Sequence, residues 1–130
     1  MNNKKKVAVY VDGFNLYHGL VNLSKSHLKW LNLKSLAEKF IDHNVESIEK
    51  VYYFSAVATF MDKDTILRHR TYIEALETAG IEFVGGNFKD KWLEYKNKHV
   101  QIKWKKHEEK ETDVNISIYM VRDALKGTYD

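Results

Sequence analysis

Two aspartates, about 100 residues apart, are the side chains of this chain best suited to chemistry. Asp12 directly follows the apolar run Val7–Val11, and Asp113 directly precedes an apolar segment with helical spacing. If both carboxylates reach one crevice, they can hold Mg²⁺ or Mn²⁺, because hard cations take oxygen ligands. Such an ion can activate a water molecule and stabilise the leaving oxygen of a phosphodiester. The pair therefore predicts a metal-dependent hydrolytic site.

The residues around Asp12 support this prediction, but they also allow a simpler, structural interpretation. The run Val7–Val11 is typical of a strand buried on both faces, and open α/β sheets bind ligands at the carboxyl ends of such strands. Gly13 lets the backbone turn sharply off the strand. Asn15 either hydrogen-bonds the Asp12 carboxylate and fixes its rotamer, or sits in the turn while Asp12 caps the next helix.

The segment around Asp113 is open to the same two interpretations. Thr112 or Asp113 suits the N-cap of the helix that follows. Alternatively, Asp113 points into the cleft of Asp12, at a helix N-terminus that favours a nearby anion. Glu111 and Asp123 are weaker candidate ligands, and Asp123 lies further along the helix.

The hydrophobic pattern alternates between strands and helices. It predicts strands at 6–11, 48–57 and 81–84, and helices at 15–23, 32–41, from 62 or 64 to 79, and from 112 or 113 to 125. Asn32 is the expected N-cap of the second helix, and Gly80 is the expected stop of the third. Apolar residues on one face support the second helix (Leu33, Leu36, Ala37, Phe40) and the last (Val114, Ile118, Val121, Leu125). This alternation predicts an α/β fold with a mostly parallel sheet flanked by helices.

Residues 87–110 form a basic segment, with eight lysines against four acidic residues. We expect a hairpin with arms at 92–95 and 100–104, turning near 97–99. A lysine excess suits a phosphate-backbone partner, and a solvated hairpin is the equal alternative. Aromatic side chains here can stack on bases or pack on the sheet, and we expect packing for at least one tryptophan (Trp92, Tyr95, Trp104).

Five cations are candidate contacts to nucleic acid: Lys103, Lys105, Lys106, Arg68 and Arg70. The three lysines belong to the expected hairpin. The two arginines lie early in the third helix, where a solvated helix face is the simpler interpretation.

Composition excludes several classes of function. The 130 residues carry a net charge of +3 and no cysteine, which rules out disulfides, thiolate zinc sites and a cysteine nucleophile. No apolar run approaches the roughly 20 residues that span a bilayer, and no signal peptide is recognisable, so we expect a cytoplasmic protein without a membrane partner. No Gly-rich phosphate-binding string of the P-loop or dinucleotide type is present.

The strand Val7–Val11 with Asp-Gly-Phe-Asn-Leu-Tyr at 12–17 resembles the opening motif of the NYN domain, a branch of the PIN-like metal-dependent ribonucleases. Segments 52–54, 70–80 and 109–116 are similar to the bacterial LabA-like members. The resemblance implies a Rossmann-like, PIN-like sheet in a single domain over residues 1–130. It also implies an acidic pocket for Mg²⁺ or Mn²⁺ and hydrolysis of RNA, with single-stranded RNA as the partner. By motif match, Asp12 and Asp113 are the pocket acids, and Asn15 is the companion of Asp12.

The sequence departs from the family pattern at its end. NYN members continue into a further strand with a Ser-Gly-Asp-Ser-Asp-like motif, whereas this sequence stops at Asp130. We therefore expect a domain without its C-terminal strand and helix, and weak or absent nuclease activity. The alternative function is a non-catalytic nucleic-acid-binding or interaction module. A missing strand would leave 7–11 as a sheet edge, which predicts a homodimer through that edge or its coverage by the chain's own helix or hairpin.

Overall fold

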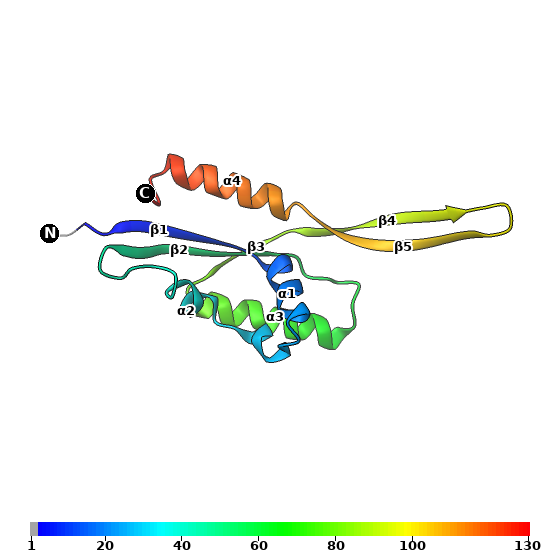
Figure 1. The fold of residues 1–130 in the computed structure, drawn as a ribbon, viewed down its shortest axis with the longest axis horizontal. Coiled ribbons are helices and arrows are strands. Elements are labelled where there is room, and N and C mark those ends of the chain that lie inside the picture. The colour runs from blue at the N-terminus through cyan, green and yellow to red at the C-terminus, as the bar shows by residue number, and fades with distance from the viewer. Residues whose placement is uncertain (1–2) are drawn as a thin grey trace.

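The computed structural model describes residues 3–130, except the side chain of Ser26. Three parallel strands form its sheet in the order β1–β2–β3, with β1 at Lys5–Asp12, β2 at Glu46–Ser55 and β3 at Glu82–Gly85. One side of the sheet carries α1 (Gly13–Asn22), the 3-10 turn η1 (Ser26–Trp30), α2 (Leu33–Ala37) and α3 (Lys63–Thr78); α4 (Thr112–Leu125) lies on the other (Figure 1). The α/β class with a parallel sheet is therefore confirmed.

Local signals set the ends of several helices as expected. The Asn32 side chain accepts hydrogen bonds from two backbone N–H groups at the start of α2, and Asp62 caps α3 through the N–H of Thr65. Gly80 follows α3 with φ +88°, a conformation that other residues seldom adopt. The helix expected at 32–41 ends at Ala37. After Ala37 the chain forms turns, in which backbone N–H groups donate hydrogen bonds to the carbonyl of the third preceding residue. Phe40, which was expected on the apolar face of the helix, is 82% exposed.

The two faces of the sheet differ in chemistry. On the side of α1 and α3, apolar side chains form the main core: Leu33, Val51, Tyr53, Ile73, Leu76 and Ile81. On the side of α4, an aromatic layer covers the strands: Tyr10 stacks on Tyr52 at 5.1 Å between ring centroids, and Tyr119 meets Tyr52 edge-on at 5.3 Å.

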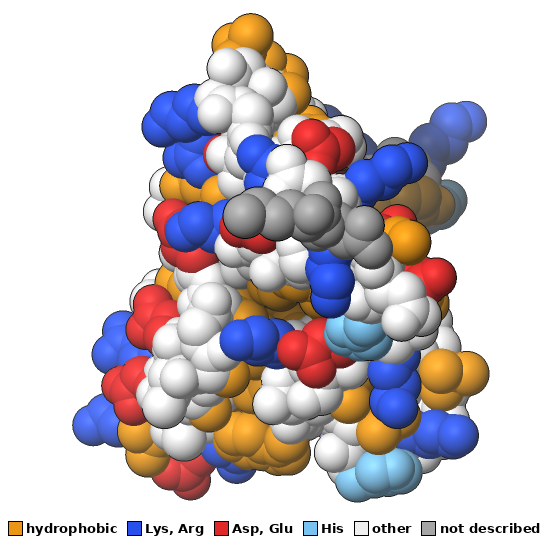
Figure 2. Space-filling model, turned by 90° about the vertical axis from the view of Figure 1, so that its left-hand side faces the viewer, with side chains coloured by type: hydrophobic (Ala, Val, Ile, Leu, Met, Phe, Trp, Pro, Cys, Tyr) orange, Lys and Arg blue, Asp and Glu red, His pale blue; other side chains and the backbone are white. Residues whose placement is uncertain are grey.

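The apolar stripe of α4 faces away from the sheet. Val114, Ile118 and Val121 are exposed, and Leu125 is 85% exposed. Figure 2, which views the end of the molecule with the termini, shows hydrophobic side chains at the surface at the level of α4, above interspersed acidic and basic groups. The helix itself was predicted, but its sheet-facing side is polar and aromatic.

The strands β4 (Asn87–Lys96) and β5 (Gln101–Lys110) form an antiparallel hairpin that extends away from the sheet (Figure 1). Ten residues at about 3.3 Å each make an arm roughly 30 Å long. The hairpin was expected, but it is longer than predicted. The expected packing of a hairpin tryptophan is wrong: Trp92 and Trp104 are 69% and 45% exposed, since most of the arm lies beyond the sheet.

β1 lies at the edge of the sheet, as expected, and the end of the chain covers its beginning. The backbone N–H of Asp130 donates to the carbonyl of Lys6 at 3.0 Å, and the N–H of Lys6 donates to the Asp130 carboxylate at 2.7 Å. A homodimer through this edge remains a prediction. Among the described residues, no helix has both the length and the apolar character needed to cross a bilayer.

Candidate functional site

Asp12 ends β1 and fulfils both roles that the sequence left open. One carboxylate oxygen accepts the backbone N–H of Asn15 at 3.1 Å and so caps α1. The other oxygen accepts the Asn15 side-chain amide at 2.8 Å. Asp12 lies two positions after Tyr10, so the alternation of a strand directs its side chain toward the face that carries α4. Asn15 therefore fixes the orientation of this carboxylate at the carboxyl end of β1.

A third carboxylate, which the sequence did not single out, connects Asp12 with Asp113. Glu109 ends β5, and Asp113 lies in the first turn of α4. Burial raises the pKa of Glu109, and the negative charges of Asp12 and Asp113 raise it further. Asp12 and Asp113 therefore each lie within electrostatic range of Glu109. We call these three residues the acidic cluster.

The backbone between β5 and α4 brings these acids close together. Glu111 has φ +79°, a left-handed conformation that is unusual for a side chain of this kind, and its carboxylate accepts the side-chain amide of Asn87 at 3.2 Å. The hydroxyl of Thr112, which is buried, donates to the Glu109 carboxylate. A Cβ at Gly86 would lie 2.9 Å from the carbonyl oxygen of Lys110, so only glycine allows this approach. The signal that sequence reading could have used is the acidic run at 108–113 directly after the expected hairpin.

The acidic cluster suits a hydrated divalent cation in donor type and charge. All of its side-chain donors are carboxylate oxygens, and the raised pKa of Glu109 reflects negative charge that a cation would compensate. Within residues 3–130, however, no three His, Cys, Asp or Glu side chains are already grouped as a metal site. Mg²⁺ commonly uses one or two protein carboxylates and keeps several waters. Asp12 and Asp113 are therefore the carboxylates that could hold such an ion, with water supplying most of its ligands.

Asp123, a weaker candidate from the sequence, belongs to a separate structural network. It is 2% exposed and accepts the Tyr10 hydroxyl at 2.7 Å and the Arg122 guanidinium at 2.8 Å. Arg122 also donates to the Tyr52 hydroxyl at 3.1 Å. Burial would raise the pKa of Asp123, but these hydrogen bonds outweigh it and lower the pKa. Burial, with the nearby Asp123 carboxylate, raises the pKa of Tyr52 to about 12. These groups satisfy one another and are not available to a ligand.

The hairpin lysines named as nucleic-acid contacts do not share one face. By strand alternation Lys103 and Lys105 lie on the face of Trp92, whereas Lys106 lies on the opposite face with Trp104. Lys105 is paired with Asp90 at 2.7 Å, and this hydrogen bond lowers the pKa of Asp90. Each face of the hairpin therefore carries only some of the lysines that were expected to contact nucleic acid.

The two arginines of α3 also differ in position. Arg68 lines a cavity between α1 and α3 and donates to the Thr65 hydroxyl at 3.0 Å. Arg70 is exposed and lies outside that cavity. The structure therefore separates two candidates that the sequence treated alike.

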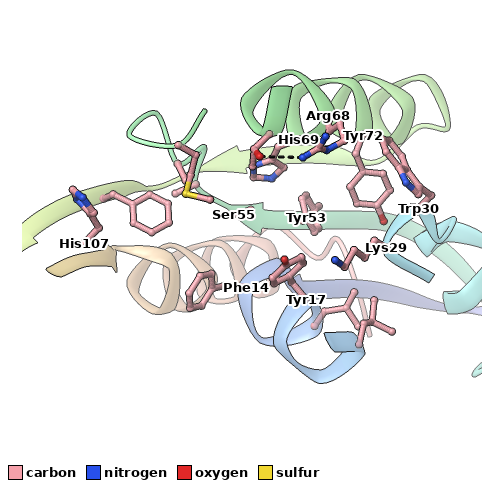
Figure 3. Close-up of a pocket in the computed structure, with 18 of the residues that line it drawn as sticks. Phe14, Tyr17, Lys29, Trp30, Tyr53, Ser55, Arg68, His69, Tyr72 and His107 are labelled. Carbon is pink, nitrogen blue, oxygen red and sulfur yellow. Dashed lines mark hydrogen bonds between the residues drawn. The ribbon is translucent and has the colours of Figure 1, made fainter. Parts of the chain in front are cut away.

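This cavity, of about 540 Å³, lies beside the acidic cluster and was not predicted. Figure 3 shows Tyr53 of β2 at its centre, with Phe14 and Tyr17 of α1 on one side and Tyr72 of α3 on the other. A Cβ at Gly13 would lie 2.5 Å from the Tyr53 ring, so the glycine after Asp12 is required by this contact. The volume falls within the range of small-molecule sites.

Three comparisons with known proteins gave no match: none with a family model, a curated protein or a solved structure. The functional interpretation therefore depends on the residues and their geometry. Two features carry it, the acidic cluster and the aromatic cavity next to it.

Proposed function

We propose that this chain is a metal-dependent ribonuclease domain of the PIN-like, NYN type, acting on phosphodiester bonds of single-stranded RNA. The observation that carries the proposal is that Asp12, at the carboxyl end of β1, and Asp113, in the first turn of α4, both lie close enough to the partly buried Glu109 to act on its charge. A carboxyl group whose pKa is raised by burial and by neighbouring carboxylates is typical of functional sites, because a structural role alone would favour paired charges. The parallel strand order with helices on both sides is compatible with a Rossmann-like sheet.

The roles of the residues follow from their positions. Asp12 and Asp113 would hold Mg²⁺ or Mn²⁺, and Asn15 positions the Asp12 carboxylate through two hydrogen bonds. When bound, the ion would polarise water and neutralise developing charge on the phosphate. Burial and the charges of Asp12 and Asp113 raise the pKa of Glu109, so Glu109 holds a proton more readily than an ordinary glutamate.

The test is cleavage of a labelled single-stranded RNA with and without Mn²⁺. We expect Mn²⁺-dependent cleavage that Asp12→Asn lowers at least about 100-fold, because a ligand should matter more than a supporting residue. Asparagine caps a helix about as well as aspartate, so the free energy of unfolding should hardly change. Asp62→Asn is the matched control, since Asp62 caps α3 in the same way outside the acidic cluster.

The second candidate function is nucleic-acid binding without cleavage through the hairpin. It is favoured by the exposed Trp92 and Trp104 and by the lysines on both faces of the arm. Binding with a steep salt dependence, but no cleavage by the wild-type chain in Mn²⁺, would support this function and contradict the nuclease.

A further inference from the structure

The cavity between α1 and α3 has walls that suit a flat aromatic ligand. Phe14, Tyr17 and Trp30 are 40–53% exposed although they surround a common space. In Figure 3, rings from α1, η1 and α3 surround the central Tyr53. Large aromatic side chains left open to solvent around a concave surface are typical of a binding site rather than of a packed core.

Two cationic side chains line this cavity, and they distinguish it from a purely apolar docking groove. Lys29 lies over the Tyr17 ring, with its Nζ 5.2 Å from the ring centroid, and the Arg68 guanidinium is held by Thr65. Within residues 3–130, neither cation forms an ion pair with a carboxylate. Burial lowers the pKa of His69, which leaves a neutral imidazole with one donor and one acceptor in the lining. Aromatic faces, two available cations and a neutral imidazole together fit a base with its phosphate.

The cavity adjoins the acidic cluster through residues next to two of its members. Tyr53 lies against Gly13, the residue directly after Asp12, and the Asp12 charge raises the pKa of Tyr53 in addition to burial. His107 of β5 lines the cavity two residues before Glu109, and Lys29 and Arg68 lie at the opposite end, near Trp30 (Figure 3). A base with its phosphate in the cavity would therefore lie next to the sequence neighbours of these carboxylates.

We propose that this cavity is a nucleobase-binding subsite that stacks one base of the RNA on Tyr17 and Trp30 and binds its phosphate through Lys29 and Arg68. The proposal rests on the proposed function for the identity of the polymer. Its chemistry requires only a base joined to a phosphate. It assigns Arg68 a direct contact with the phosphate and leaves Arg70 outside the site.

A mononucleotide titration without metal tests the subsite directly. The full chain carrying Asp12→Asn is titrated with 2-aminopurine riboside 5′-monophosphate, whose fluorescence falls when the base stacks. We expect saturable quenching, and Tyr17→Ala or Trp30→Ala should weaken binding about tenfold each, since stacking is lost. Phe40→Ala is the control for loss of an exposed aromatic ring and should change nothing, because Phe40 lies outside the cavity.

The phosphate contact is tested by comparing this nucleotide with its unphosphorylated riboside. The riboside should bind several-fold more weakly, and the double variant Lys29→Gln, Arg68→Gln should bind both equally. Arg70→Gln is the matched control and should keep the difference. Absence of saturable quenching, equal effects of the control variants, or equal competition by inorganic phosphate alone would overturn the subsite.

The outcomes also separate this inference from the nuclease proposal. If the nucleotide binds but wild-type chain with Mn²⁺ cleaves no RNA, the nuclease fails and the subsite stands. If RNA is cleaved but Tyr17→Ala and Trp30→Ala alter neither nucleotide binding nor KM, the subsite fails and the nuclease stands. Binding of an apolar dye in the cavity without any nucleotide binding would point to a different occupant and overturn the inference.

Discussion

β1 and α4 meet in two regions that contain carboxylates, and the two regions have opposite electrostatics. Near the middle of the strand, Tyr10 meets Asp123, whose pKa is lowered because hydrogen bonds from tyrosines and Arg122 satisfy the charge. At the end of the strand, burial and the charges of Asp12 and Asp113 raise the pKa of Glu109, which lies near the end of β5. The contact of β1 with α4 thus includes a satisfied network and, where β5 joins it, a repulsive one.

The difference between the two regions suggests that the Asp123 network serves stability and the acidic cluster serves function. A buried carboxylate with complete hydrogen bonding fixes how a helix packs on a sheet, and its loss leaves its partners unsatisfied. A cluster of acids costs stability in the free protein, and it gains a purpose only when a cation or a proton compensates the charge. We therefore expect substitutions in the Asp123 network to reduce stability and substitutions in the acidic cluster to reduce activity.

The largest expected effect on stability is that of Asp123→Asn. The substitution removes a buried charge that accepts hydrogen bonds from Tyr10 and Arg122, and loss of hydrogen bonds to a buried charge costs about 2 kcal/mol of unfolding free energy. Urea denaturation measures the loss. Asp113→Asn is the control on the same helix and should change stability by less than about 1 kcal/mol, since Asp113 is exposed. Equal losses for the two variants would contradict the contrast between the regions.

A smaller effect of opposite sign is expected for Glu109→Gln. Burial and neighbouring charge raise the pKa of Glu109 above its ordinary value of 4.5, so the folded state binds this proton more tightly than the unfolded state. The wild type therefore loses stability as the pH rises from about 4.5 through the raised pKa, and glutamine does not. We expect the variant to be more stable at pH 7 by at most about 1 kcal/mol, with the difference vanishing below pH 4.

The neighbouring Glu108 provides the control for this pH dependence. A hydrogen bond from Lys110 is the largest contribution that lowers the pKa of Glu108, so its charge is favourable in the folded state. Glu108→Gln should therefore show no gain at pH 7. Thermal unfolding of both variants between pH 4 and pH 8 compares them, and a gain for Glu108→Gln equal to that for Glu109→Gln would attribute the effect to general charge rather than to the acidic cluster.

The sequence predicted most elements because their signals are local. Alternating strands and helices, the caps at Asn32 and Asp62, and the turn at Gly80 all depend on nearby residues, and all are observed. Asp12 with Asn15 was also recognisable, since the two residues lie three positions apart. Glu109 was missed because its importance comes partly from its proximity to Asp12, which lies far earlier in the chain, and the acidic run at 108–113 does not encode that contact.

The orientation of α4 was beyond prediction for a different reason. An amphipathic pattern identifies the apolar side of a helix, and that side normally faces the sheet. Here Tyr10 and Tyr52 present hydroxyl groups on the sheet, and they match the polar side of α4 through Asp123 and Arg122. The aromatic cavity was missed similarly, because its walls come from segments of the chain that lie far apart in the sequence, from Gly13 to His107.

The smallest effect is expected on the outward side of α4. Ile118 lies on the exposed stripe, so Ile118→Lys should change the free energy of unfolding of the monomer by less than about 0.5 kcal/mol. Ile116→Lys is the matched substitution on the half-buried side, which it shares with Thr112, and it should cost more than about 1 kcal/mol because a charge would enter the contact with the sheet. Urea denaturation at several protein concentrations distinguishes the two. If Ile118→Lys instead strongly lowers the free energy of unfolding, and the loss depends on protein concentration, a second copy of the chain covers the apolar stripe in solution. The outward side of α4 would then be an interface between two chains.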